Sequence, residues 1–167
     1  MIIVIRIKDV AQIAILAVII FGIEAALMFL PNVQVTVLLI VVYSKVFNLK
    51  KSILIVTIYT ILDNLLFLNI YYLPFMLVGW LVIPVSLNTV FKKVNNVYIL
   101  ATLSIFYVLF YSLMYVVADV IILKIGFLER MLSDSIFVMI FIVSSFVSIL
   151  WLYEPLKKLI LKLEEKL

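Results

Sequence analysis

The chain has 167 residues, of which 68% are hydrophobic and only 13% are charged, and its formal net charge is +4. Soluble domains carry about 25% charged residues, so this composition excludes an ordinary soluble domain and predicts an all-α integral membrane protein. Cysteine and histidine are absent from the sequence, which excludes disulfides, thiolate chemistry, imidazole bases and the commonest soft metal ligands, and we expect no metal and no cofactor.

Six apolar stretches, separated by proline, asparagine and lysine, read as transmembrane helices, each of which needs about 20 residues. We expect one domain, a six-transmembrane-helix bundle, with spans at residues 10–30, 33–47, 52–70, 73–91, 97–122 and 135–153. The first stretch is interpreted as a retained helix, because no charged region with a small-residue cleavage site accompanies it. The second stretch is short, so it needs either shielding by neighbouring helices or side chains that snorkel to the interface.

Lysine and arginine are distributed unequally over the connections between these spans. They gather before the first span, around the second and fourth connections, and in the tail, whereas only Lys124 and Arg130 fall on the other side. Cytoplasmic loops carry an excess of these residues. The pattern therefore predicts that both termini are cytoplasmic and that connections one, three and five face outward, the fifth with room for a short interfacial segment at 124–134. We read the positive charge as a topology signal and expect no nucleic acid partner.

The tail at residues 154–167 has an amphipathic pattern. Leu156, Leu159, Ile160 and Leu163 share one face of a helix, and lysine and glutamate occupy the other faces. This arrangement is typical of a cytoplasmic amphipathic helix. It serves either as a simple membrane anchor or as a contact for a partner.

Three acidic residues lie inside predicted spans, namely Glu24, Asp63 and Asp119. The predicted orientation places all three in the outer half of the bilayer, where ionisable groups normally face a cavity or a partner. Asp119 is close enough to the surface to be merely solvated, and Glu24 has the alternative of a protonated side chain that bonds a neighbouring helix. Asp63 has no lysine or arginine at its depth, so a role in ligand binding or a polar network is favoured.

Other polar and aromatic residues are expected at the same depth as the carboxylates. Together they predict a substrate-binding pocket open to the outside, formed by Glu24, Asn32, Gln34, Asp63, Asn64, Tyr71, Tyr72, Trp80 and Asp119. The aromatic residues have the alternative of an interfacial belt, although Trp80 sits deeper than a belt requires. Because no lysine or arginine is expected within the spans, a neutral or cationic solute is favoured over a phosphate or carboxylate.

Small residues recur in the first span, where Gly22 and Ala26 form a small-xxx-small pair. Such pairs let helices approach closely. They indicate either packing inside the bundle or docking to another membrane protein.

Several motifs extend over nearly the whole chain. They are an alanine-rich first helix, the Phe-Leu-Pro-Asn-Val turn at 29–33, the Lys50-Lys51 connection, the Leu-Asp-Asn-Leu-Leu run at 62–66, the outer Tyr71-Tyr72 loop and the Glu-Pro-Leu-Lys-Lys run at 154–158. This set resembles the substrate-binding S components of energy-coupling factor (ECF) transporters, which are six-helix vitamin-uptake subunits. The resemblance implies a vitamin-like solute bound in the outer half of the bundle, in a prokaryotic plasma membrane, and two kinds of partner: a transmembrane coupling subunit and two cytoplasmic ATPases.

In that family an Ala-x-x-x-Ala motif of the first helix contacts the coupling subunit. Here Ala14 is followed at that spacing by Val18, and the relaxed form of the motif is met by Gly22 and Ala26. The resemblance therefore implies that Ala11, Ala14, Val18 and Gly22 dock to the partner.

Two other classes of protein are weighed against this interpretation. A membrane scaffold similar to the rod-shape determinant MreD has a comparable length and helix count, and it predicts no outward ligand pocket. An intramembrane enzyme is disfavoured, because no nucleophile with an adjacent base is visible and the carboxylates are scattered over three helices. The sequence also lacks a phosphate-binding loop, so any ATP is expected to be hydrolysed by another subunit.

Overall fold

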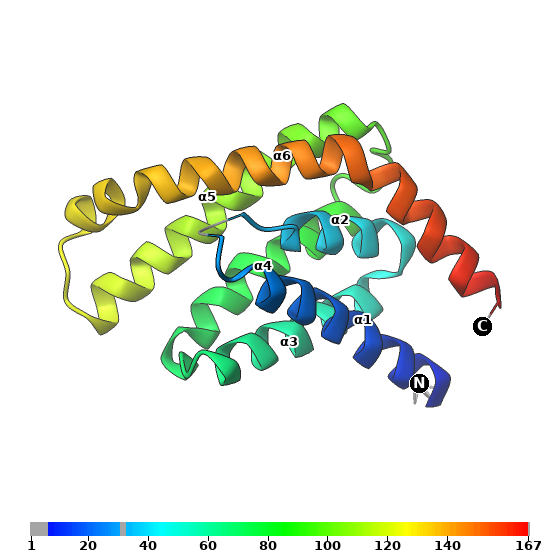
Figure 1. Cartoon of the computed structure of the whole chain (residues 1–167), viewed down its shortest axis with the longest axis horizontal. Coiled ribbons are helices and arrows are strands. Elements are labelled where there is room, and N and C mark those ends of the chain that lie inside the picture. Colours follow the sequence, from blue (N-terminus) through cyan, green and yellow to red (C-terminus); the bar gives the residue numbers. More distant parts are fainter. Residues whose placement is uncertain (1–6, 31–32, 167) are drawn as a thin grey trace.

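The computed structural model describes residues 7–30 and 33–166, and this part of the chain contains helices and no strands. The elements in chain order are α1 (Ile7–Leu27), α2 (Thr36–Val46), α3 (Leu49–Leu66), the 3-10 helix η1 (Ile70–Tyr72), α4 (Leu73–Asn88), α5 (Val97–Ile122) and α6 (Phe127–Lys166). The helices run alternately in opposite directions (Figure 1). The connections after α1, α3 and α5 therefore lie toward one end of the bundle, and both termini lie toward the other.

Four helices in the described part of the chain are long and apolar enough to cross a membrane. They cover Lys8–Leu27, Ile70–Asn88, Val97–Ile122 and Phe127–Glu165. The protein is accordingly an all-helical, membrane-embedded chain. The other two helices differ from these four, because α2 has only 11 residues and α3 carries two lysines and an aspartate within its 18 residues.

The shortest helix, α2, is the centre of the bundle. Its residues from Thr36 to Ser44 are all buried, and it contacts each of the other five α-helices. It is shorter than the predicted span at 33–47, because the segment before Thr36 makes a tertiary contact instead of a helical turn. The backbone N–H of Gln34 donates to the Ser144 hydroxyl of α6 at 3.4 Å. Because α2 is buried on all sides, its residues are apolar around the whole helix although the helix is short.

Capping interactions set the ends of α3. The helix begins three residues before the predicted span at 52–70, because the Asn48 side chain accepts a hydrogen bond from the Lys51 N–H at 3.0 Å, which is a typical N-cap. It ends early, because Leu68 adopts a left-handed conformation with φ of 55°. The N–H of Asn69 then donates to the Asn64 carbonyl at 3.0 Å, which completes a Schellman-type end.

The helix α4 also ends before its predicted span at 73–91 does. The residues after Asn88 are held by a side chain from α2 instead of by a further helical turn, since the Lys45 ammonium donates to the Phe91 carbonyl at 2.7 Å. A neighbouring bond joins the same two helices, because the Asn88 side chain donates to the Ser44 carbonyl at 3.0 Å. These contacts tie α2 to α4 at the end of the bundle where the termini lie.

The predicted sixth span and tail form one helix. α6 has 40 residues, so it includes most of the predicted connection at 124–134, the span at 135–153 and the described part of the tail. Pro155 lies within it, where it removes a backbone hydrogen bond and clashes with the preceding turn. The helix changes direction in its C-terminal part (Figure 1).

The tail packs only half of its predicted apolar face against the bundle. Ile160 is buried and Leu156 is half-buried, whereas Leu159 and Leu163 are more than half exposed. An ion pair between Lys51 of α3 and Glu164, at 3.8 Å, joins the tail to the bundle. The remaining leucines face outward, as an interfacial helix requires.

The close approach of α4 and α5 depends on Gly79. A Cβ added there would lie 2.8 Å from Cδ2 and 3.3 Å from Cα of Tyr111, which is too close for ordinary packing. We therefore expect Gly79→Ala to lower the free energy of unfolding by about 1–3 kcal/mol, because the two helices must move apart. Thermal melting of the purified protein in detergent micelles measures the loss.

Gly22→Ala is the matched control for this substitution. Apart from the helix backbone around Gly22 itself, no atom of the described residues lies within 4 Å of a Cβ added there, and alanine is the better helix former. Its melting temperature should equal or exceed that of the wild type. Equal losses in the two variants would contradict the packing role of Gly79.

Candidate functional site

A cavity of about 490 Å³ lies toward the end of the bundle where the connections after α1, α3 and α5 meet. This volume is in the range of small-molecule sites, which is about 300–1,000 Å³. The final turns of α1 and α3, the second half of α5 and the first turns of α4 and α6 supply most of its walls. The lining residues are Glu24, Leu27, Met28, Leu30, Val33, Gln34, Asp63, Phe67, Asn69, Met76, Tyr111, Ser112, Tyr115, Arg130, Asp134, Phe137 and Phe141.

One wall of the cavity carries Glu24 of α1 and Asp63 of α3. The Tyr59 hydroxyl donates a hydrogen bond to one carboxylate oxygen of Glu24. Asp63 is 6% exposed, and its carboxylate has no hydrogen bond or ion pair with any residue in the described part of the chain. The two groups lie close enough for their charges to interact. This wall is therefore acidic and lacks a cation of its own.

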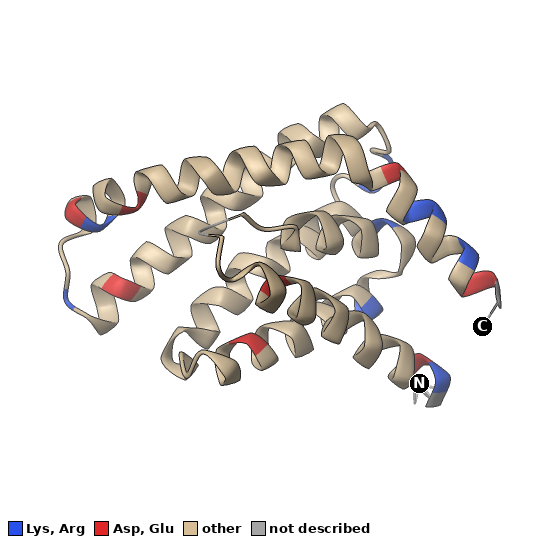
Figure 2. Cartoon of the chain, in the orientation of Figure 1, with Lys and Arg blue, Asp and Glu red and all other residues tan. Residues whose placement is uncertain are grey.

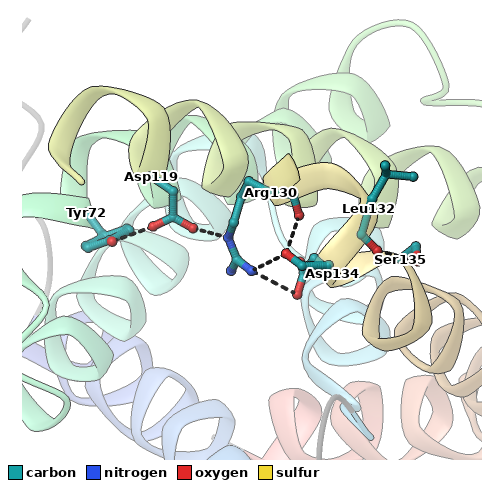
Figure 3. Close-up of polar contacts among 7 residues, drawn as sticks. Tyr72, Asp119, Arg130, Leu132, Asp134 and Ser135 are labelled. Atoms are coloured by element: carbon teal, nitrogen blue, oxygen red, sulfur yellow. Dashed lines mark hydrogen bonds and ion pairs between the residues drawn. The ribbon is translucent and has the colours of Figure 1, made fainter. Parts of the chain in front are cut away.

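A second wall of the cavity carries Arg130, which lies between two carboxylates (Figure 3). Its Nε donates to Asp119 of α5, and its Nη1 lies 3.7 Å from the Asp134 carboxylate one turn further along α6. The Tyr72 hydroxyl of η1 donates to the other oxygen of Asp119 at 2.5 Å. These bonds connect α5, α6 and the connection after α3.

This network corrects two expectations from the sequence. Asp119 is not merely solvated, because its side chain is only 3% exposed and is paired with Arg130. Arg130 is not in a loop, because α6 begins at Phe127 and brings the guanidinium into the cavity wall. A basic side chain therefore does line the cavity, but two carboxylates on the same side already neutralise it.

Aromatic side chains form the wall between these two charged regions. Trp80 is 1% exposed and stacks on Tyr111, with ring centroids 4.0 Å apart. Its indole also contacts the edges of Tyr59 and Phe141, at centroid distances of 6.2 and 6.3 Å. Tyr111 and Phe141 face the cavity, so Trp80 supports the wall from behind.

Some of the residues predicted for the pocket meet at this cavity. Glu24, Gln34 and Asp63 line it directly. Asp119 and Tyr72 bond to each other, and Asp119 reaches the cavity through Arg130. They belong to the same site, although they come from three α-helices and two connections.

The other predicted pocket residues lie elsewhere. Asn64 is fully buried behind the acidic wall, where its side-chain N–H group donates to the Thr60 carbonyl at 2.9 Å. Trp80 is buried in the bundle, and Tyr71 is 75% exposed, which suits the interfacial-belt alternative for that tyrosine. Asn32 lies outside the described residues.

Several lining residues were not predicted from the sequence. They are chiefly the α5 and α6 side chains Tyr111, Ser112, Tyr115, Arg130, Asp134, Phe137 and Phe141. Depth along a helix follows from the sequence, but the rotation of each helix about its axis does not. A signal for Arg130 was nevertheless present, because Phe127, Leu128, Met131 and Leu132 continue an apolar helical pattern ahead of the predicted sixth span.

The residues predicted to dock a partner share one face of α1. Ala11, Ala14, Val18 and Gly22 are all exposed, and no residue in the described part of the chain covers Gly22. The small-xxx-small pair therefore does not pack inside this bundle. The described residues of the chain leave this face uncovered.

No protein-family model matches the chain, and searches of curated proteins and of solved structures also find no match. The geometry of the cavity is therefore the basis for a functional assignment. Its polar groups lie on two walls with rings between them, an arrangement typical of small-molecule sites.

Proposed function

We propose that this protein is the substrate-binding subunit of an ATP-driven importer and that it captures a vitamin-like solute in the cavity described above. The observation that carries the proposal is the cavity itself, which places the unpaired Asp63 carboxylate, Glu24 and several aromatic rings around about 490 Å³. Ionisable groups at membrane depth normally mark a solute pathway or binding site. A scaffold of the MreD type predicts no such pocket, so the cavity favours the binding subunit.

In this proposal all six helices cross the plasma membrane. The short helix α2 is compatible with crossing, because other helices surround it and lipid does not contact it. Non-helical backbone at membrane depth is tolerated where it is buried in protein or lines a water-filled cavity. Val33 and Gln34, just before α2, line the cavity, so the segment meets this condition.

Both termini are cytoplasmic in the proposed topology, and the cavity faces outward. Lysine and arginine colour mainly the end of the molecule that carries the termini (Figure 2), as the positive-inside rule requires of a cytoplasmic side. The cavity lies toward the opposite end. A solute that arrives from outside therefore reaches it without crossing the bundle.

The proposed partners are a transmembrane coupling subunit and two cytoplasmic ATPases, as the resemblance to S components implies. The exposed face of α1 at Ala14, Val18 and Gly22 supports a docking role, because small residues let another helix approach closely. The sequence contains no phosphate-binding loop of its own. Energy from ATP must then come from another subunit.

Ligand binding by the purified protein tests the proposal. The chain has two tryptophans, so the Trp151→Phe variant leaves Trp80, against the cavity wall, as the only indole. We expect one class of compound in a panel of vitamins and nucleobase-like solutes to change the fluorescence emission of Trp80 and to raise the melting temperature of the protein. Saturation at 100 times the dissociation constant stabilises a protein by about 2.7 kcal/mol.

Asp63→Asn should abolish both responses, because it removes the unpaired carboxylate with almost no change in shape. Glu129→Gln is the control, since Glu129 is an exposed carboxylate on the same side of the molecule. Co-purification of the chain with coupling-module ATPases tests the partners separately. The absence of any response over a broad panel, with co-purification of cytoskeletal proteins instead, would favour the scaffold.

A further inference from the structure

The charges that face the cavity are not balanced. Arg130 has Asp119 and Asp134 as partners on its own wall. Glu24 and Asp63 on the other wall have no lysine or arginine partner among residues 7–30 and 33–166, and the structure provides Glu24 with a phenol, Tyr59, instead. Even with Arg130 counted, the carboxylates that line the cavity outnumber its single cation.

An uncompensated carboxylate is strongly unfavourable in an apolar environment. Asp63 is more than nine-tenths buried and lines the cavity without a protein partner. Glu24 interacts with the hydroxyl groups of Tyr59 and Thr36, which are neutral and leave its charge without a cation among the described residues. A positive group that entered between Glu24 and Asp63 would be attracted to both carboxylates. Any N–H of that group would donate charge-assisted hydrogen bonds to them, which are about twice as strong as neutral ones.

The aromatic lining of the cavity indicates the shape of a solute that carries such a positive group. The rings of Phe67, Tyr111, Tyr115, Phe137 and Phe141 line the cavity. Aromatic faces stack on planar rings and attract cations. A volume of about 490 Å³ is also far larger than a bare metal ion needs.

We infer that the cavity binds an organic cation with a planar ring, with its positive group held by Glu24 and Asp63 and its ring against Tyr111 and Phe141. The inference rests on the proposed function and narrows its solute from a vitamin-like molecule to a class of defined charge. Arg130 does not select an anion in this arrangement, because its charge is taken up by Asp119 and Asp134.

Matched probes of different charge test the inference. The first set has 1-methylnicotinamide as the cation, nicotinamide as the neutral compound and nicotinate as the anion; the second has benzylamine, benzyl alcohol and benzoate. Binding to the full chain in detergent micelles is followed by Trp80 emission in the Trp151→Phe background and by thermal melting. Sodium, potassium and magnesium chlorides are titrated in parallel.

We expect each cation to bind at least tenfold more tightly than its neutral counterpart, and the anions to bind weakest. Asp63→Asn and Glu24→Gln should each remove this preference, whereas Glu129→Gln should keep it. If one of the two carboxylate variants does not fold, the other still decides the question.

The possible failures separate the inference from the proposed function. Equal or tighter binding of the neutral or anionic probes overturns the organic cation and leaves a solute-binding subunit. A response to the inorganic salts alone overturns it as well. No response to any probe, together with none in the vitamin panel, counts against both.

Discussion

Arg130→Met should lower the free energy of unfolding by about 3–5 kcal/mol, because it leaves a buried carboxylate without its cation. The side chain of Asp119 is only 3% exposed, and after the substitution it retains only the Tyr72 hydroxyl. Tyr72 belongs to η1, so the loss also loosens the connection after α3 from α5 and α6 (Figure 3). The loss of helical circular dichroism on titration with a denaturing detergent measures the effect.

A double substitution distinguishes the stability contributed by the ion pair from the stability contributed by side-chain packing. Replacing a buried pair with apolar residues of similar size is often neutral, so Asp119→Leu combined with Arg130→Met should recover most of the lost stability. Lys124→Met removes an exposed cation near the same end and should change stability by no more than about 0.5 kcal/mol. If Arg130→Met changed stability as little as Lys124→Met does, the network of Tyr72, Asp119 and Arg130 would have no structural role.

Trp80→Ala is expected to cost about 3–5 kcal/mol, because it removes the largest buried side chain of the described core. Tyr111 would lose the ring stacked on it at 4.0 Å, and Phe141 would lose an edge contact. Both line the cavity, so probe binding should weaken as well. Thermal melting and probe titration of the same preparation measure the two effects.

Trp151→Ala is the control for Trp80, because it removes the same side chain from a position that is 76% exposed. Its melting temperature and probe binding should remain close to those of the wild type. Similar losses in both variants would mean that the indole of Trp80 contributes no more than a surface residue, which contradicts its role behind the cavity wall.

Local signals allowed some helix ends to be predicted. The helix α5 covers the predicted residues, 97–122, because the Asn96 side chain caps its N-terminus with bonds of 2.8 and 3.4 Å to the next turn. The ends of α2 and α4 could not be predicted in this way. They depend on Ser144 and Lys45, which contact segments 110 and 46 residues away in the sequence.

The candidate site shows the same division between local and long-range information. Glu24 and Asp63 were expected at one depth and meet in one cavity, because depth follows from position along a helix. Residues that are neighbours in the sequence face different surroundings, because successive side chains of an α-helix point about 100° apart. Asp63 therefore lines the cavity while Asn64 does not, and only the packing of α3 determines which of the two faces inward.

Hydropathy and charge act residue by residue, so the amino-acid sequence is sufficient to predict a helical membrane protein with its basic residues gathered at one side. Which side chains share the cavity depends on how the helices pack. The tertiary structure paired Arg130 with Asp119 across 11 residues of chain and left Glu24 and Asp63 without a cation. The reason is that charge compensation depends on which groups meet when the helices pack, and helix rotation is set by packing.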